Sequence, residues 1–166
     1  FHPSRIVDLD PEGSPLQDSF ARAREREIPM QLLDLTADFG VPVYRAFTRI
    51  GGQLLSGSGC HLDGRIAATR AICELTPKIH VFMTALAETR DPEKPLTCER
   101  RESARTISYH DLPNYSSGSV RGDLAALEAM MEANGCPPIY VNLTRADAQI
   151  PVVRVIVPGL DMPEKL

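Results

Sequence analysis

Candidate chemistry in this chain is concentrated in one stretch near the middle of the sequence. Residues 57–63 read GSGCHLD and contain two glycines, which have the backbone freedom that a tight turn requires. Asp63 stands where a helix N-cap belongs, because its carboxylate could accept the free amide protons of a following first turn. The pattern therefore predicts a glycine-rich turn, shaped by Gly57 and Gly59, that leads into a helix beginning at Gly64.

The predicted helix carries two charged residues on one face, Arg70 and Glu74, because they are four positions apart. The amide groups at its start would favour an anion, and a carboxylate such as Glu74 is a typical ligand of Mg²⁺. His61, at the entrance, could donate to a phosphate or polarise a substrate group. The alternatives are an exposed Arg70–Glu74 ion pair, worth about 0.3–0.5 kcal/mol, and a hydrogen-bonded structural histidine at position 61.

The composition is that of an ordinary soluble globular protein. The 166 residues are 43% hydrophobic and 24% charged, with a formal net charge of −4, which predicts one domain. The negative charge gives no general attraction to nucleic acid or anionic lipid. No apolar run approaches the roughly 20 residues that span a bilayer, so we expect no nucleic-acid or membrane partner. Because Phe1 is not a normal start, we expect a fragment or a processed product.

Four cysteines are scattered along the chain without Cys-x-x-Cys spacing: Cys60, Cys73, Cys98 and Cys136. This distribution predicts reduced, mostly buried thiols in a cytoplasmic protein. The alternative is a zinc site that uses Cys60 and His61, for which the sequence offers no second ligand pair at the usual spacing.

Hydrophobic periodicity and turn residues divide the chain into short elements. Strands are predicted at 5–7, 30–35, 41–48, 139–143 and 152–157, and helices at 16–27, 64–76, 79–87 and 122–134. Pro77 should end the helix that begins at Gly64. The nearly continuous β-branched run at 152–157 predicts a fully buried strand, and the polar residues 89–106 predict a surface excursion.

An internal repeat relates the two ends of the chain. Residues 33–45 (LDLTADFGVPVYR) align with residues 141–154 (VNLTRADAQIPVVR), and an amphipathic helix is predicted before each copy. Two helix-strand-turn-strand units around a central glycine turn and helix indicate an α+β fold with a mixed sheet and packed helices. Each turn carries Asx residues: Asp34, Asp38, Asn142 and Asp147. Capping of the local backbone explains them, with metal binding as the alternative. Arg45 and Arg154 could contact phosphate or pair across the sheet.

The same stretches resemble a known family. The GSGCHLD segment, followed at matching spacings by Ile-Ala, Arg-Ala and Glu, is similar to the late signature of YcaO-domain proteins, above all the subunits that form azolines in ribosomal peptides. Residues 34–43, 112–118 and 150–160 extend the resemblance over nearly the whole chain. Residues 1–166 are therefore identified as the C-terminal part of a YcaO-like domain.

The resemblance implies an ATP-dependent reaction on peptide backbone amides. A thiol, hydroxyl or sulfide attacks the carbonyl carbon, ATP phosphorylates the resulting oxyanion, and phosphate departs to leave an azoline or a thioamide. The implied cofactors are ATP and Mg²⁺. The implied nucleotide-binding residues are Gly57, Gly59, His61, Arg70 and Glu74, with Glu74 also binding the metal. One departure is Pro77, which stands where the family's Glu-x-x-Gln motif has glutamine.

The implied partners are a substrate peptide and a partner protein or N-terminal half-domain, and we expect a homo-oligomer. Because the nucleotide motifs of the family's N-terminal half are missing, we predict that this segment alone is inactive. The alternative is a non-catalytic, degenerate half-domain that acts as a scaffold or a peptide-binding module, which Pro77 favours. A third reading is a stand-alone metal hydrolase based on Glu74, His61 and the aspartates.

Overall fold

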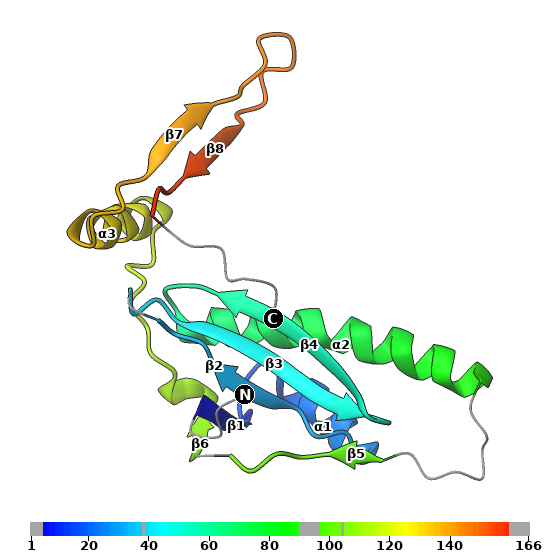
Figure 1. The fold of residues 1–166 in the computed structure, drawn as a ribbon. Helices are drawn as coiled ribbons and strands as arrows, with labels where there is room; N and C mark the ends of the chain where they lie inside the picture. Colours follow the sequence, from blue (N-terminus) through cyan, green and yellow to red (C-terminus); the bar gives the residue numbers. More distant parts are fainter. Residues whose placement is uncertain (1–4, 38, 90–96, 104, 160–166) are drawn as a thin grey trace. The chain divides into compact units, whose positions relative to one another are not determined.

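A computed structural model of the chain describes residues 5–37, 39–89, 97–103 and 105–159 (Figure 1). The chain divides into an N-terminal unit, Phe1–Tyr115, and a C-terminal unit, Ser116–Leu166. The N-terminal unit contains β1 (Ile6–Asp10), α1 (Gln17–Glu25), β2 (Gln31–Asp34), β3 (Val43–Ile50), β4 (Gln53–Cys60), α2 (Gly64–Thr89), β5 (Cys98–Glu99), β6 (Arg105–Ser108) and a 3₁₀ helix, η2 (Tyr109–Asp111). The C-terminal unit contains α3 (Val120–Ala133), β7 (Ile139–Asn142) and β8 (Val153–Ile156).

The N-terminal unit is built on a mixed sheet with the strand order β4-β3-β2-β1-β6. Neighbouring strands are antiparallel except β1 and β6, which are parallel, and β5 pairs with the end of β3. Helices α1 and α2 pack on this sheet. The α+β class with a mixed sheet and packed helices is therefore confirmed; the expectation of one domain stays a prediction.

The core lies between the sheet and the two helices. Helix α2 contributes a run of small and branched residues that are almost completely buried: Ala67, Ala68, Ala71, Ile72 and Leu75. The strands contribute Val7, Leu9, Leu32, Tyr44, Ala46 and Ile50 to the same cluster, and Leu16, Phe20 and Ala23 join it at α1. The alanines on α2 leave room for the helix to lie close to the strands beneath it.

The glycine-rich turn predicted within residues 57–63 is wrong for residues 57–60, which form the second half of β4. Strand β4 pairs with β3 along its whole length, from Ile50 opposite Gln53 to Val43 opposite Cys60. The glycines serve packing rather than turning. A Cβ atom at Gly59 would lie 2.1 Å from the Ala67 carbonyl oxygen of α2, and one at Gly57 would lie 2.5 Å from the Ala71 carbonyl oxygen.

The prediction that the helix ends near Pro77 is wrong. Helix α2 runs without a break over 26 residues, from Gly64 to Thr89. Pro77 lies on the exposed side of the helix, where the carbonyl group of Cys73 that it leaves without an amide partner can be hydrated. Leu75 and Ile79 on either side of Pro77 are buried. Tertiary packing therefore holds the helix across the proline.

The predicted polar excursion at 89–106 is only partly described, since residues 90–96 and 104 lie outside the described residues. Within the described part, Cys98–Glu99 forms β5, and the excursion ends in β6, which runs parallel to β1. Sequence alone missed both strands because β5 is two residues long and β6 is the outer strand of the sheet, with two exposed residues.

The structure confirms the internal repeat in atomic detail. In the first copy, Thr36 N–H donates to Asp34 Oδ1 at 2.9 Å, and Val43 N–H donates to Thr36 Oγ1 at 3.2 Å. In the second copy, Thr144 N–H donates to Asn142 Oδ1 at 2.9 Å, and Val152 N–H donates to Thr144 Oγ1 at 3.1 Å. Backbone capping is therefore the role of Asp34 and Asn142. Asp147 pairs with Arg145, and Asp38 lies outside the described residues.

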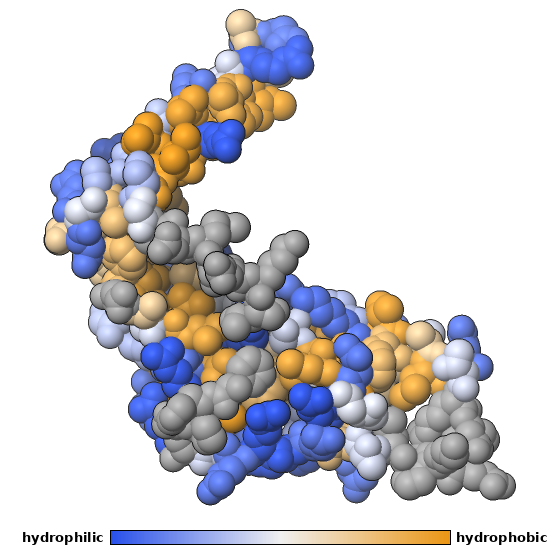
Figure 2. All heavy atoms as spheres, viewed as in Figure 1, coloured by the Kyte–Doolittle hydropathy of each residue, from blue (hydrophilic) through white to orange (hydrophobic). Residues whose placement is uncertain are grey.

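The C-terminal unit carries the second copy as helix α3 and a two-stranded β7–β8 hairpin. Ser119 caps α3 by accepting the Gly122 N–H at 3.1 Å, and Gly135, with φ of 72°, ends it as predicted. The prediction of a fully buried strand at 152–157 is wrong, because Val153 and Val155 are more than half exposed. Figure 2 shows the apolar side chains gathered along this hairpin.

The cysteines are free thiols, as predicted, but they are not buried. Cys60 and Cys73 are exposed, and Cys98 and Cys136 are partly exposed. Among the described residues, no helix is both long enough and apolar enough to cross a membrane.

Candidate functional site

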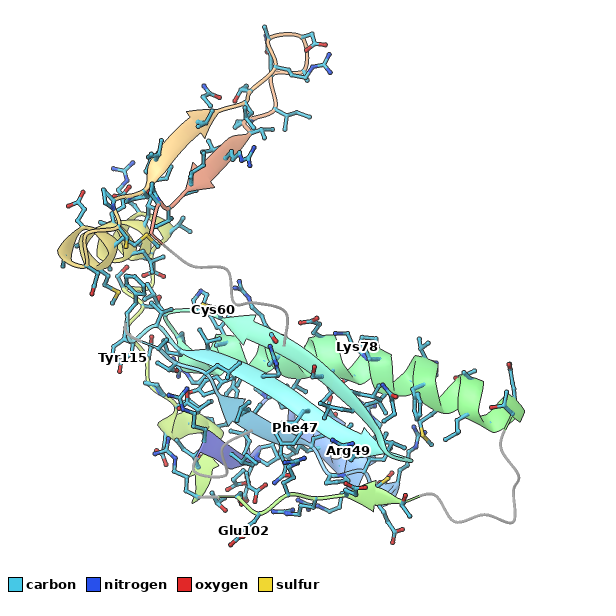
Figure 3. All side chains as sticks on the ribbon, in the orientation of Figure 1. Phe47, Arg49, Cys60, Lys78, Glu102 and Tyr115 are labelled. Atoms are coloured by element: carbon cyan, nitrogen blue, oxygen red, sulfur yellow. The ribbon has the colours of Figure 1, made fainter. Side chains whose placement is uncertain are left out.

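Three charged side chains of α2 follow the outer edge of β4. β4 is the last strand in the sheet order, and its outward backbone groups bond to the helix instead of to another strand. Arg70 Nη1 donates to the Cys60 carbonyl at 3.0 Å, Ser58 N–H donates to Glu74 Oε2 at 2.7 Å, and Lys78 Nζ donates to the Ser56 carbonyl at 2.7 Å. We call these six residues the β4-edge cluster; Figure 3 labels Cys60 and Lys78 at its two ends.

The sign of each side chain matches the backbone group that it contacts. The two cations face carbonyl oxygens, and the one carboxylate faces an amide proton. Helix residues at i, i+4 and i+8 share one face, and every second residue of β4 presents its backbone groups at the edge. This arrangement covers an edge that would otherwise invite pairing with another chain.

Glu74 is the centre of the cluster. Its side chain is 50% exposed, and Lys78 Nζ lies 2.8 Å from Oε1. The hydrogen bond from Lys78 is the largest cause that lowers the pKa of Glu74, followed by the backbone N–H of Ser58. Glu74 is therefore held as a carboxylate whose two oxygens each have a donor.

Arg45 adds a third cation beside this carboxylate. It lies opposite Ser58 in the β3–β4 pairing, its Nε donates to Ser58 Oγ at 3.4 Å, and its charge contributes to the lowered pKa of Glu74. Lys78 and Arg45 thus act on the Glu74 carboxylate, and Arg70 adds a further positive charge at the Cys60 end of the cluster. The local charge is thus positive on a chain whose net charge is −4, which suits a phosphorylated or otherwise anionic ligand.

The structure brings some of the predicted site residues together and separates others. Arg70 and Glu74 both belong to the β4-edge cluster, but Glu74 pairs with Lys78, and the predicted Arg70–Glu74 pair is not among the ion pairs of the described residues. Gly57 and Gly59 point toward α2, where they allow the close approach that lets Glu74 reach Ser58. Lys78 was missed from sequence, although a Glu followed by Lys four residues later was the available signal.

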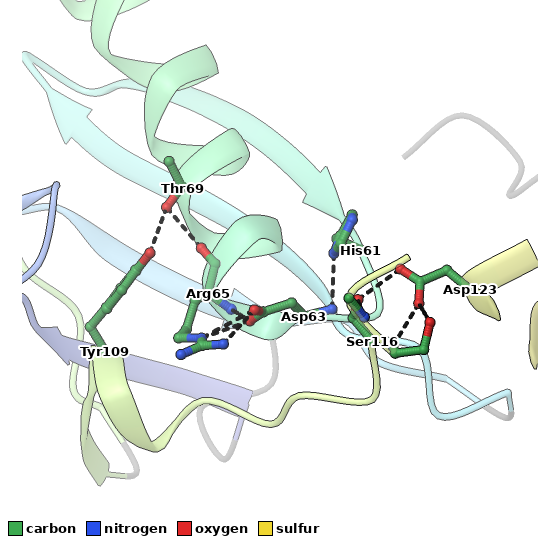
Figure 4. A network of polar contacts seen from close by, with 9 residues as sticks. His61, Asp63, Arg65, Thr69, Tyr109, Ser116 and Asp123 are labelled. Carbon is green, nitrogen blue, oxygen red and sulfur yellow. Dashed lines mark hydrogen bonds and ion pairs between the residues drawn. The ribbon is translucent and has the colours of Figure 1, made fainter. Parts of the chain in front are cut away.

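The entrance to α2 is occupied by groups of the chain itself (Figure 4). Asp63 caps the helix as predicted: its Oδ1 accepts the Arg65 N–H at 2.9 Å, and its carbonyl accepts the Ala67 N–H at 3.0 Å. The Gly64 N–H donates to the Pro113 carbonyl at 2.7 Å. An external anion at this helix start would therefore have to displace the Asp63 carboxylate.

His61 and Arg65 complete this capping network. Asp63 N–H donates to His61 Nδ1 at 2.9 Å, so His61 is a hydrogen-bonded histidine, as its alternative reading proposed. Arg65 Nη2 lies 2.6 Å from Asp63 Oδ2, and the hydrogen bond from Arg65 lowers the pKa of Asp63. Thr69 Oγ1 and the Tyr109 hydroxyl, 3.2 Å apart, join the first turns of α2 to η2.

Pockets of two sizes lie against the described helices of the N-terminal unit. One of about 520 Å³ is lined by residues of β1 and α1 together with Cys98, Arg100 and Thr106, and one of about 230 Å³ lies between α1 and α2. Glu74 lines neither. In the described part of the chain, no three His, Cys, Asp or Glu side chains come together as a metal cluster, so the zinc alternative finds no support.

Comparison with known proteins places these features in a family. The sequence model described as "YcaO cyclodehydratase, ATP-ad Mg2+-binding" matches residues 2–161. The chain is 33% identical over 156 residues to an uncharacterized protein of Methanothermobacter thermautotrophicus, covering 81% of this chain and 40% of that protein. It is 26% identical over 155 residues to an uncharacterized protein from the tfuA 3′ region of Rhizobium leguminosarum bv. trifolii, covering 79% and 36%. The chain thus spans well under half of either relative.

Solved structures share the fold. The heterocyclase TruD matches with a TM-score of 0.70 and 25% identity, over 95% of this chain and 24% of that one. YcaO from Methanopyrus kandleri, solved with AMPPCP and Mg²⁺, matches with a TM-score of 0.59 and 23% identity, over 98% of this chain and 50% of that one. With the family match over most of its length, this chain belongs to the YcaO family.

Proposed function

We propose that this chain is part of an ATP-dependent YcaO-type enzyme that activates peptide backbone amides, by cyclodehydration to an azoline or by thioamidation. Family membership and the likeness to the heterocyclase TruD support this reaction class. The observation that carries the proposal is the position of Glu74, a carboxylate at the edge of β4 that is paired with Lys78 and lies near Arg45, with Arg70 in the same cluster.

In this proposal the cations bind the nucleotide. Arg45, Arg70 and Lys78 would face phosphate oxygens, and His61 would assist from the start of α2. Gly57 and Gly59 would act indirectly, because they bring α2 close enough to β4 to hold the cluster. Electrostatic stabilisation of a transferred phosphoryl group is the main catalytic task in such reactions.

The donor set is compatible with Mg²⁺ held together with a nucleotide. Mg²⁺ bound with phosphates often uses only one or two protein carboxylates, and Glu74 supplies one. Its Oε1 is paired with Lys78 at 2.8 Å, so the metal would have to displace that ammonium group. Bound there, Mg²⁺ would neutralise charge on the triphosphate.

Isothermal titration calorimetry with Mg²⁺-ATP tests the proposal. The 166-residue chain should release or absorb heat, and Glu74→Ala should weaken the association at least tenfold. Glu88→Ala is the matched control, since Glu88 is an exposed glutamate of the same helix outside the cluster. Absence of binding heat, or equal affinity in Glu74→Ala and the unmodified chain, would contradict a nucleotide site at Glu74.

The whole reaction is proposed to require more than this segment. The substrate would be a peptide, and a partner protein or N-terminal half-domain would complete the enzyme, which we expect to be a homo-oligomer. The isolated chain should therefore show no peptide-dependent ATP hydrolysis. Phosphate release that rises with added peptide would overturn this expectation.

A second candidate function is a non-catalytic scaffold or peptide-binding module. Two features favour it: Pro77 stands in α2 where the family resemblance implies a glutamine, and Lys78 is already paired with Glu74. On this reading the β4-edge cluster only protects a sheet edge. A chain that gives no heat with Mg²⁺-ATP but binds a peptide would support it.

A further inference from the structure

The second copy of the internal repeat is structurally incomplete when it is compared with the first. The similarity of the copies extends beyond the turns. Both helices end in the same way, since Ile28 N–H donates to the Ala23 carbonyl and Cys136 N–H donates to the Met131 carbonyl, each at 2.9 Å. This six-residue closure is a Schellman motif. The copies therefore provide a residue-by-residue comparison.

The residue that closes each helix has a left-handed backbone, with φ of 55° at Glu27 and 72° at Gly135. A proline follows two positions later in each copy, Pro29 and Pro137. The following hairpins also share one register. Leu33 lies opposite Arg45 in β2–β3, and Val141 lies opposite Arg154 in β7–β8.

Equivalent residues differ sharply in burial. In the first copy, β2 and β3 are inner strands that pair outward with β1 and β4, and α2 packs over them. In the second copy, β7 and β8 pair only with each other among the described residues. The exposed fractions are 0% for Leu32 against 45% for Tyr140, 3% for Leu33 against 37% for Val141, 4% for Tyr44 against 57% for Val153, 0% for Ala46 against 52% for Val155, and 3% for Phe47 against 42% for Ile156.

The sequence of the β7–β8 hairpin is that of inner strands. Val153, Val155 and Ile156 place apolar side chains on both faces of β8, which is typical of a strand covered on both sides. A two-stranded hairpin by itself is marginally stable in water. The outer edge of β4 is covered by charged side chains of α2, but no such charged stripe covers β8 among the described residues.

We propose that the β7–β8 hairpin accepts a β-strand followed by an amphipathic helix, the same kind of element as β4–α2, from outside the described residues. The strand would add antiparallel to β8, as β4 adds to β3, and the helix would cover Tyr140 and Val155 as α2 covers Leu32 and Ala46. Strand addition supplies backbone hydrogen bonds and burial together. The β4–α2 element of this chain already pairs with β3, and in a second copy of the chain it would do the same. The partner element therefore has to be a different one. The proposal holds whether or not the chain binds nucleotide.

The partner strand should carry small residues where its helix lies closest. On the first copy, Gly57 lies opposite Ala46 and Gly59 lies opposite Tyr44, and a Cβ at either position would collide with the α2 backbone. By equivalence, the partner strand should place glycine opposite Val155 and Val153. Bulky side chains there would keep the helix off the hairpin.

A chain extended by a Gly/Ser linker and a second copy of residues 53–89 provides a defined probe. Hydrogen exchange of residues 153–156, followed by mass spectrometry, should be at least tenfold slower in the extended chain than in the unmodified one. The control carries Gly57→Val and Gly59→Val in the added copy only, which leaves the N-terminal unit unchanged. Its β8 exchange should return to the rate of the unmodified chain.

Three results would overturn the proposal. The first is β8 exchange that does not change on extension. The second is slowed exchange of β8 that is equal for the glycine and the valine versions of the added copy. That result would show that the added segment does not bind β8 as β4–α2 binds β3. The third is protection of β8 in the unmodified chain that rises with protein concentration, because a second copy would then be the occupant.

Discussion

The Ser58 backbone N–H donates to Glu74 Oε2 across 2.7 Å, which ties the edge strand of the N-terminal sheet to the middle of α2. The residue that family resemblance implies for the metal thus also has a structural contact. Any substitution of Glu74 therefore affects the implied metal binding and the hydrogen bond to Ser58 at the same time. Separating the two roles requires variants of its neighbours.

Lys78→Met should raise the pKa of Glu74 toward its usual value, because the hydrogen bond from Lys78 is the largest cause of the lowered pKa. The free energy of unfolding should fall by less than about 1 kcal/mol, since the pair is half exposed. NMR titration of the Glu74 carboxyl carbon measures the shift. Lys78→Arg, which keeps a cation, should move the midpoint less; an unchanged midpoint in Lys78→Met would show that Lys78 does not hold the carboxylate in solution.

Gly59→Ala should lower the free energy of unfolding by about 3 kcal/mol, at the upper end of overpacking effects. The added Cβ would lie 2.1 Å from the Ala67 carbonyl oxygen, and a backbone atom cannot turn aside as a side chain can. Urea denaturation measures the change. Ser58→Ala, on the neighbouring position with an exposed side chain, should cost less than about 0.5 kcal/mol. Equal stabilities would mean that α2 is not seated on β4 as described.

Asp63→Asn should reduce stability by about 1 kcal/mol at neutral pH, because asparagine can still cap the helix but cannot pair with Arg65. The pKa of Asp63 is lowered in the folded chain, so its carboxylate stabilises the fold above the unfolded-state pKa of about 3.9. This contribution is lost as the pH falls through the lower, folded-state value.

Urea denaturation of both chains between pH 7 and pH 3 measures the effect of Asp63. The two free energies of unfolding should converge toward the acid end of this range. A difference that stays constant with pH would show that charge on Asp63 is not the cause.

Thr36→Val and Thr144→Val should have unequal effects although they remove equivalent hydrogen bonds. Thr36 Oγ1 accepts the Val43 N–H in a partly buried turn, and Thr144 Oγ1 accepts the Val152 N–H in an exposed one. Loss of the first acceptor should cost about 1–2 kcal/mol, and water should replace most of the second. Amide exchange at Val43 and Val152 measures each loss; equal changes would contradict the burial argument.

Local chemistry predicted from sequence was reliable where one residue determines the outcome. Asp63 capped its helix, Gly135 ended another, and Asp34 and Asn142 closed the repeated turns. These motifs need only neighbouring backbone groups.

Predictions failed where packing between distant elements decides. Gly57 and Gly59 are typical of a turn, yet they lie in a strand. Glycine is needed there because the α2 backbone leaves no room for a Cβ atom. Pro77 is typical of a helix end, yet α2 continues past it because Leu75 and Ile79 on either side are buried in the core. Lys78 belongs to the candidate site because α2 lies along the edge of β4 and brings Lys78 Nζ to the Ser56 carbonyl. Apart from the i,i+4 pair of Glu74 and Lys78, these contacts depend on how α2 packs on the sheet.

The contacts at Cys60, Ser58 and Ser56 also match the spacing of residues along α2 to the spacing of residues along β4. Four helical residues advance about 6 Å, and two residues of an antiparallel strand advance about 6.8 Å, so the two repeats stay nearly in phase over three contacts. Sliding α2 along β4 by one contact would move all three side chains off their present partners and carry one of them past the end of this row of contacts. The three matched contacts therefore favour one axial position of α2 against β4.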